Sequence, residues 1–153
     1  MAVPSIYNKY IIDPDKEQAG IVKDFGDFVI TVARAGGSNE SYGRVMAELF
    51  APYEQVMALN EMSDEVAAEI WHKVLCRTVI KHWAFKRDDP TEPGKKLLVQ
   101  GLGMDEYGNV VAATEDNICE LFKVAKELFV EIRTFAERRE NFSLANKAAA
   151  AKN

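Results

Sequence analysis

The chain has little cysteine, no long apolar run and no surplus of basic residues. With only two cysteines, Cys76 and Cys119, in 153 residues, a disulfide framework is excluded and a reduced, cytosolic setting is expected. The apolar runs are too short to span a bilayer, and residues 1–10 lack the pattern of a signal peptide. A formal net charge of −5 disfavours nucleic-acid binding, which normally requires a basic surplus. Neither nucleic acid nor a membrane is therefore expected as a partner.

The sequence also lacks the motifs of common reaction centres. It contains neither glycine-rich phosphate-binding motif, GxGxxG or GxxxxGK[ST], and no GxSxG nucleophile motif. Its carboxylates lie mostly in the first turns or on the charged faces of predicted helices, so no acid–base pair can be selected from them. No catalytic or cofactor-binding residue is assigned, and the chain is predicted not to be an enzyme.

One weak candidate for a metal site remains. His72 and Cys76 are four residues apart and therefore share a face of a predicted helix. A structural zinc site usually has at least three protein ligands, and His82 lies off that face while Cys119 has no neighbouring histidine or cysteine in the sequence. A partly buried thiol beside a helix histidine is the better interpretation, so no metal ligand is assigned.

The sequence does contain amphipathic segments, in which apolar and charged residues alternate; 48% of its residues are hydrophobic and 28% are charged. Residues 1–19 mix aromatic residues, charges and prolines, and they are predicted to form an irregular arm. Residues 20–34 alternate around a short glycine-containing turn, which predicts a β-hairpin. Gly36 and Gly37 then allow a sharp turn with positive φ, after which Ser38 or Asn39 is expected to accept the first free N–H groups of a helix.

Apolar spacing predicts two helical segments in the middle of the chain. The first starts near Asn39 and is interrupted at Pro52, because a proline inside a helix removes one hydrogen bond and clashes with the preceding turn. The second follows Ser63, a good N-cap residue, and is expected to run to about Trp83.

The last third of the chain is predicted to be a long connection followed by the strongest helix. Residues 84–113 form the connection, in which segments 97–99 and 110–111 are expected to pair as a second small hairpin. Thr114 caps the final helix, whose apolar face continues without a break as far as Phe135.

Together these patterns predict a mostly α protein of the α+β class. A small N-terminal β-hairpin is followed by a bundle of three to four amphipathic helices. The expected organisation is an irregular arm over 1–19, a single helical domain with its hairpin over 20–140, and a mobile C-terminal tail over 141–153. With no reaction centre and many apolar side chains, such a chain is typical of proteins that bind other proteins.

Four short segments stand out, in this order: Phe28 to Tyr42 with its Arg34-Ala35-Gly36-Gly37-Ser38-Asn39 core, Pro52-Tyr53, Arg77-Thr78-Val79-Ile80-Lys81-His82-Trp83, and Thr114-Glu115-Asp116-Asn117. Together these segments resemble the tail assembly chaperones of long-tailed bacteriophages. The connection 84–113 and the first twenty residues depart from the pattern of that family.

The resemblance implies a non-enzymatic protein that binds the tape measure protein and the tail tube protein before the tube polymerises. It would act in the host cytoplasm, could self-associate, and would be absent from the mature virion. A groove between amphipathic helices could cover the apolar face of the tape measure helix. Candidate groove residues are Leu49, Phe50, Leu128, Phe129, Phe142 and Leu144, and for each of them a place in the core is the commoner alternative. The alternative function is a head–tail connector or another structural or adaptor protein of the virion.

The family also implies a second, longer product made by a ribosomal slip near the end of the gene. The ending Ala151-Lys152-Asn153 can be encoded by a run of adenines, which would permit such a slip. A plain alanine-lysine tail of weak helical tendency is the other interpretation of these residues.

Overall fold

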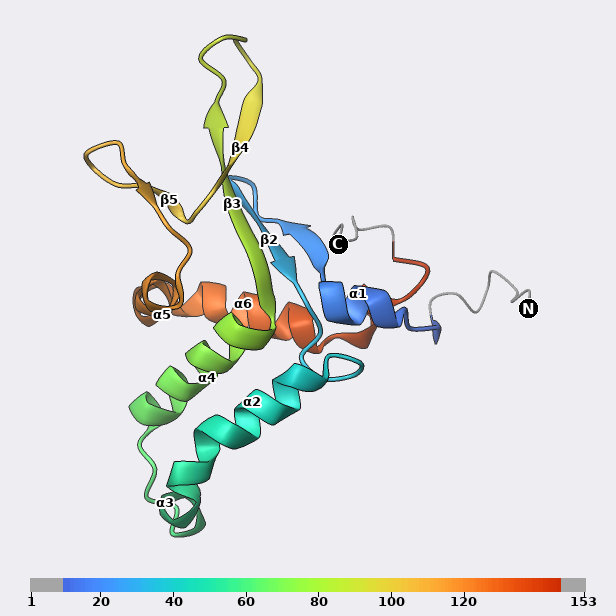
Figure 1. Cartoon of the computed structure of the whole chain (residues 1–153), viewed down its shortest axis with the longest axis vertical. Coiled ribbons are helices and arrows are strands. Elements are labelled where there is room, and N and C mark those ends of the chain that lie inside the picture. The colour runs from blue at the N-terminus through green and yellow to red at the C-terminus, as the bar shows by residue number, and fades with distance from the viewer. Residues whose placement is uncertain (1–9, 147–153) are drawn as a thin grey trace.

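The computed structural model describes residues 10–146 and has a mixed α+β fold, which confirms the predicted class (Figure 1). A four-stranded antiparallel sheet has the strand order β1-β2-β3-β4, and a separate two-stranded hairpin pairs β5 with β6. The strands are β1 (Ile21–Asp24), β2 (Phe28–Val32), β3 (Ile80–Asp88), β4 (Lys96–Gln100), β5 (Gly103–Met104) and β6 (Val110–Val111).

The helices gather around the lower half of this sheet (Figure 1). Helices α2 and α4 pack side by side, α4 also packs on α5, and α6 lies against β2. The helices are α1 (Pro14–Ala19), α2 (Glu40–Phe50), α3 (Glu54–Ala58), α4 (Asp64–Thr78), α5 (Glu115–Val124) and α6 (Lys126–Glu137), with 3-10 turns at Ala51–Tyr53 and Arg139–Phe142. The buried core lies between sheet and helices and includes Ile30, Val32, Leu75, Val79, Trp83, Ile118, Phe122 and Ile132.

The predicted N-terminal hairpin is confirmed. Strands β1 and β2 pair with Ile21 opposite Val32, and the turn between them contains Gly26 at a φ of 99°. Ile30 and Val32 face the core, as the alternation of apolar residues predicted. The bundle that was expected to follow is matched only in part, because two further strands of the same sheet separate α4 from α5.

The expected helix as far as Trp83 is wrong, because α4 ends at Thr78 and β3 begins at Ile80. Three consecutive β-branched residues, Thr78, Val79 and Ile80, lie at this boundary, and such residues favour extended backbone. Sheet pairing then decides the conformation, since β3 bonds to β2 on one edge and to β4 on the other. Trp83 is therefore a buried residue of a central strand.

The expected pairing of segments 97–99 and 110–111 is also wrong. The first belongs to β4 and pairs with β3, placing Val99 opposite Phe85. The second is β6, which pairs with β5. The 84–113 region thus forms two hairpins, and the outer part of the β3–β4 hairpin projects beyond the helices (Figure 1).

The final helix has the predicted start but not the predicted continuity. Thr114 caps it through a hydrogen bond from the Asn117 N–H to Thr114 Oγ1 (3.2 Å). The helix then breaks at Ala125, whose φ of −103° and ψ of 64° separate α5 from α6. The break allows α5 to pack on α4 while α6 packs on β2. The apolar face that was predicted to be continuous is therefore divided between these two contacts.

The two ends of the described chain are more ordered than the predicted arm and tail. Residues 14–19 form α1, whose cap residue Asp13 accepts a hydrogen bond from the Asp15 N–H (3.0 Å). Past the expected boundary at 140, the Phe142 side chain is fully buried and Ser143 bridges to Ile12. The rest of the predicted arm and tail, including the 151–153 ending, lies outside the described residues.

A cluster of polar side chains joins α1, β2 and α2, and we call Glu17, Arg34, Gly37, Ser38 and Asn39 the α1–α2 junction. Both predicted glycines have positive φ, 114° at Gly36 and 55° at Gly37, as expected. Glu17 is buried, and its carboxylate accepts hydrogen bonds from Arg34 (2.8 Å) and from the Ser38 N–H (3.1 Å).

The expected cap at this junction has a different role from the predicted one. Asn39 is the N-cap residue of α2, but its side chain does not cap the helix N–H groups. Its amide instead donates to the carbonyl oxygens of Arg34 and Thr78, each at 2.8 Å. Asn39 therefore fixes the strand end and the end of α4 to the start of α2.

Candidate functional site

A largely apolar cavity lies between α4 and the α5–α6 pair, and we call it the α4–α6 groove. Its cavity has a volume of about 540 Å³. Residues from all three helices line it: Asp64, Glu65, Ala68, Glu69 and His72 from α4, Phe122 and Lys123 from α5, and Lys126, Phe129 and Val130 from α6. A smaller cavity of about 230 Å³ adjoins it, and the two share Glu69, His72 and Lys123.

Three rings form the floor of the groove. His72 lies edge-on to Phe129 with ring centroids 4.7 Å apart, and Phe122 lies 5.5 Å from His72 and 5.3 Å from Phe129. Phe122 also contacts Trp83 of β3, so the floor is supported from below by the sheet. Because this cluster is anchored in the core, the groove has a rigid apolar base.

The two rims of the groove carry opposite charge. Asp64 and Glu65 lie in the first turn of α4, where carboxylates suit the helix dipole, and Ser63 caps that turn by accepting from the Val66 N–H (3.2 Å). The opposite rim carries Lys123 and Lys126. An apolar floor between an acidic and a basic rim matches a segment that has one apolar face and charges on both flanks.

His72 is the unusual side chain of the floor, because it is only 6% exposed and its Nδ1 atom has no hydrogen-bond partner. Burial, together with the charge of Lys123, lowers the pKa of this histidine, while Glu69 acts in the opposite direction. At neutral pH the groove therefore contains a neutral imidazole that packs like an aromatic ring.

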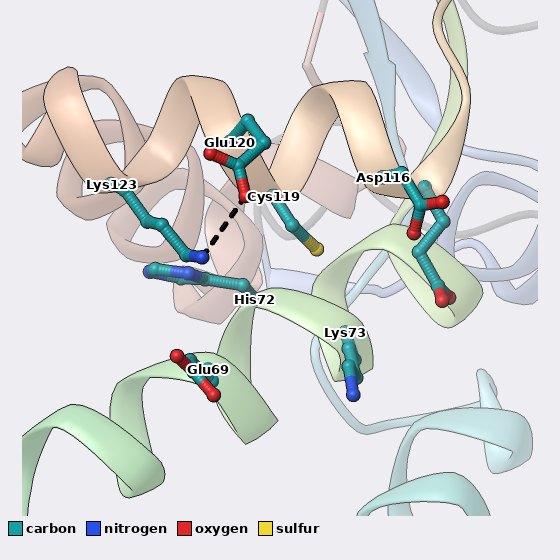
Figure 2. A pocket seen from close by; sticks show the side chains of 8 residues that line it. Glu69, His72, Lys73, Asp116, Cys119, Glu120 and Lys123 are labelled. Atoms are coloured by element: carbon teal, nitrogen blue, oxygen red, sulfur yellow. Dashed lines mark hydrogen bonds and ion pairs between the residues drawn. The ribbon is translucent and has the colours of Figure 1, made fainter.

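The smaller cavity is polar. Figure 2 shows side chains of α4 and α5 facing it from its two sides, with the Lys123 ammonium paired to Glu120 (3.0 Å). Glu115, also in its wall, makes a two-point ion pair with Arg77 (2.6 and 3.2 Å). The hydrogen bond from Arg77 lowers the pKa of the Glu115 carboxyl. This pair helps to hold α5 against α4 beside the groove.

The structure brings together two cysteines that sequence spacing kept apart. Cys76 Sγ on α4 lies 3.9 Å from Cys119 Sγ on α5, although the residues are 43 positions apart. His82 is an exposed residue of β3 and lines a small cavity together with Cys76. Each cysteine sits beside an inward-facing apolar residue, Leu75 or Ile118, but only knowledge of the α4–α5 packing could have paired them.

Of the six residues predicted for partner binding, Phe129 lines the groove. Its neighbour Leu128 packs against the core. Leu49 and Phe50 lie half-buried on α2, where the Phe50 ring contacts Trp71 at 5.2 Å. Phe142 is fully buried and Leu144 is 48% exposed near the end of the described chain. The six residues therefore do not form one surface, and sequence reasoning missed Phe122, His72 and Val130.

Comparisons of the chain with protein-family models, with curated proteins and with solved structures find no match. Within residues 10–146, no group of three or more histidine, cysteine or acidic side chains is arranged to hold a metal ion. No helix in that range is long and apolar enough to cross a membrane. What defines the protein is thus a mixed α+β fold with an apolar, charge-rimmed groove.

Proposed function

We propose that this chain is a non-enzymatic tail assembly chaperone of a long-tailed phage. It holds the tape measure protein and the tail tube protein soluble in the host cytoplasm and leaves before the virion is complete. The observation that carries the proposal is the α4–α6 groove, and the four family-like segments indicate which partners to test.

The groove suits an amphipathic helix. Apolar side chains spaced at i, i+3, i+4 and i+7 along a partner helix would contact Phe122, Phe129 and Val130. Acidic residues on one flank of that helix would face Lys123 and Lys126, and basic residues on the other would face the α4 rim. A long tape measure helix aggregates when its apolar face is bare, so covering that face keeps it soluble.

The alternative, a head–tail connector or other virion adaptor, is favoured by a different surface. The β3–β4 and β5–β6 hairpins expose Leu98, Met104, Tyr107 and Val110, and projecting apolar arms suit permanent contacts in an assembled particle. Mass spectrometry of purified virions separates the two functions. An abundant copy in the particle supports the adaptor, and its absence supports the chaperone.

Co-expression with the tape measure protein encoded in the same genome tests the chaperone function. The fraction of tape measure protein that stays in the supernatant after lysis is measured with and without this chain. The proposal predicts a clear increase when the chain is present. A tape measure protein that is equally insoluble in both cases contradicts it.

A further inference from the structure

We propose that Cys76 and Cys119 form an oxidisable dithiol that closes to an intrachain disulfide between α4 and α5. The two Sγ atoms are 3.9 Å apart, and a disulfide bond requires about 2.05 Å. The helices that carry them are packed directly against each other, so side-chain rotation and a small adjustment are enough to close the gap. This site is independent of the proposed chaperone function.

The two thiols have different access to solvent reagents. Cys119 lines the open polar cavity shown in Figure 2, together with Lys73 and Glu115. Cys76 does not line that cavity; it lines a different, smaller one of about 100 Å³, together with Ile80 and Trp83. A small oxidant entering the polar cavity therefore reaches Cys119 first, and Cys76 is placed to resolve the product.

Electrostatics supports the same order. Burial raises the pKa of both thiols, so neither reacts quickly at neutral pH. The rise is the larger for Cys76, which makes Cys119 the more readily ionised thiol.

Oxidised glutathione is sufficient as the oxidant. The Cys119 thiolate attacks one glutathione sulfur, forms a mixed disulfide and expels the other glutathione as a thiolate, which takes up a proton. Cys76 then loses its proton to solvent and attacks Cys119 Sγ, expelling the second glutathione. Two protein thiols are oxidised and one glutathione disulfide is reduced to two glutathione molecules. Excess reduced glutathione reverses the reaction.

The closed bridge would join the end of α4 to the start of α5 and enclose the entire β3–β6 region in one covalent loop. A loop of this size restricts the unfolded chain strongly, so the thermal midpoint of the oxidised protein should rise by about 5 to 10 °C.

The test uses the purified, reduced full chain incubated with oxidised glutathione at mildly alkaline pH without denaturant. Expected results are loss of both free thiols, loss of two hydrogen atoms in the intact mass and no dimer. Tryptic digestion should yield peptide 74–77 linked to peptide 97–123. A protein that keeps both thiols free, or that forms the link only after denaturation or between two chains, overturns the proposal.

Single serine variants test the order of reaction. Cys76→Ser should retain one glutathione on Cys119, and its thermal midpoint should lack the rise seen for the oxidised wild type. Cys119→Ser should take up glutathione several-fold more slowly. Faster labelling of Cys76 than of Cys119 contradicts the order proposed here. If either variant fails to fold, peptide mapping of the partly labelled wild-type chain measures the same order.

Discussion

The α1–α2 junction and the α4–α6 groove differ in how many hydrogen bonds their buried polar side chains make. At the junction, Glu17 is 4% exposed and both of its oxygens accept hydrogen bonds, while Asn39 uses both of its amide hydrogens. Arg34 Nε is the atom left without a partner there. In the groove, His72 is equally buried but its Nδ1 has no partner, and an apolar cavity lies above it.

This difference indicates what each region is for. A network of hydrogen-bonded polar groups holds the chain segments in one arrangement. Loss of one group leaves its buried partners with neither water nor a hydrogen-bond partner. A groove whose floor is apolar, and whose polar groups do not all have hydrogen-bond partners, contributes less to the stability of the fold. It can bind another molecule instead. Substitutions at the junction should therefore change stability, and substitutions at the rim of the groove should change binding.

The largest expected effect is that of Glu17→Ala. It removes the partner of Arg34, whose side chain is mostly buried, and it also leaves the Ser38 N–H without its acceptor. The free energy of unfolding should fall by about 3 to 5 kcal/mol, as measured by chemical denaturation. The matched control is Glu48→Ala, which breaks the exposed Arg44–Glu48 pair and should change stability by less than about 0.5 kcal/mol. Equal losses in the two variants would show that the buried Glu17 contacts contribute no more to stability than an exposed ion pair does.

A smaller loss is expected for Gly37→Ala. The residue has a φ of 55°, and an added Cβ would clash with the Glu17 carboxylate. The carboxylate cannot move away without breaking its bonds to Arg34 and Ser38, so backbone strain and a damaged network add to about 2 to 3 kcal/mol. Gly43→Ala is the control, because Gly43 is a helix residue with open space around it. It should instead stabilise the chain by about 0.5 to 1 kcal/mol. A neutral Gly37→Ala variant in denaturation curves would contradict the account.

The groove should contribute a pH dependence to the stability of the fold through His72. Burial lowers the folded-state pKa of His72 below its unfolded value of about 6.5. As pH falls from 7 to 5.5, the unfolded chain therefore binds a proton that the folded chain resists. Stability should fall over this range with a slope of at most about 1.4 kcal/mol per pH unit from this group. His72→Gln should remove that slope, and His82→Gln, at an exposed position, should retain it. An unchanged slope in His72→Gln would show that His72 is not the titrating group.

Features controlled by local chemistry could be predicted from the sequence. The first hairpin, the caps at Ser63 and Thr114 and the positive φ at Gly37 follow from turn and cap preferences that act over a few residues. The change from helix to strand at Val79 and the break at Ala125 could not be predicted in the same way. Trp83 fits a helical spacing as well as a strand, and only pairing with β2 and β4 decides between them.

The candidate site was less accessible to prediction than the fold. The apolar, aromatic character that predicts Phe129 as a groove residue describes core residues equally well, and Phe142 is such a core residue. The groove itself depends on how far α6 stands from α4, which the sequence pattern of neither helix encodes. The same reason explains the missed contact between Cys76 and Cys119, since it exists only where α5 packs on α4.

The most direct test of the central claim, that the α4–α6 groove binds the partner helix, compares two exposed valines. Val130 is 57% exposed and lines the groove, whereas Val124 is 84% exposed and is not among the lining residues. Neither Val130→Glu nor Val124→Glu should destabilise the fold by more than about 0.5 kcal/mol.

Each variant is co-expressed with the partner that we propose, a tape measure protein encoded in the same genome, and the affinity of the purified chain for that protein is measured in parallel. We predict that Val124→Glu keeps the partner soluble as well as the wild type does, and that Val130→Glu binds at least about tenfold more weakly, a loss of about 1.4 kcal/mol. Equal binding by the two variants would contradict the assignment of the groove as the partner site.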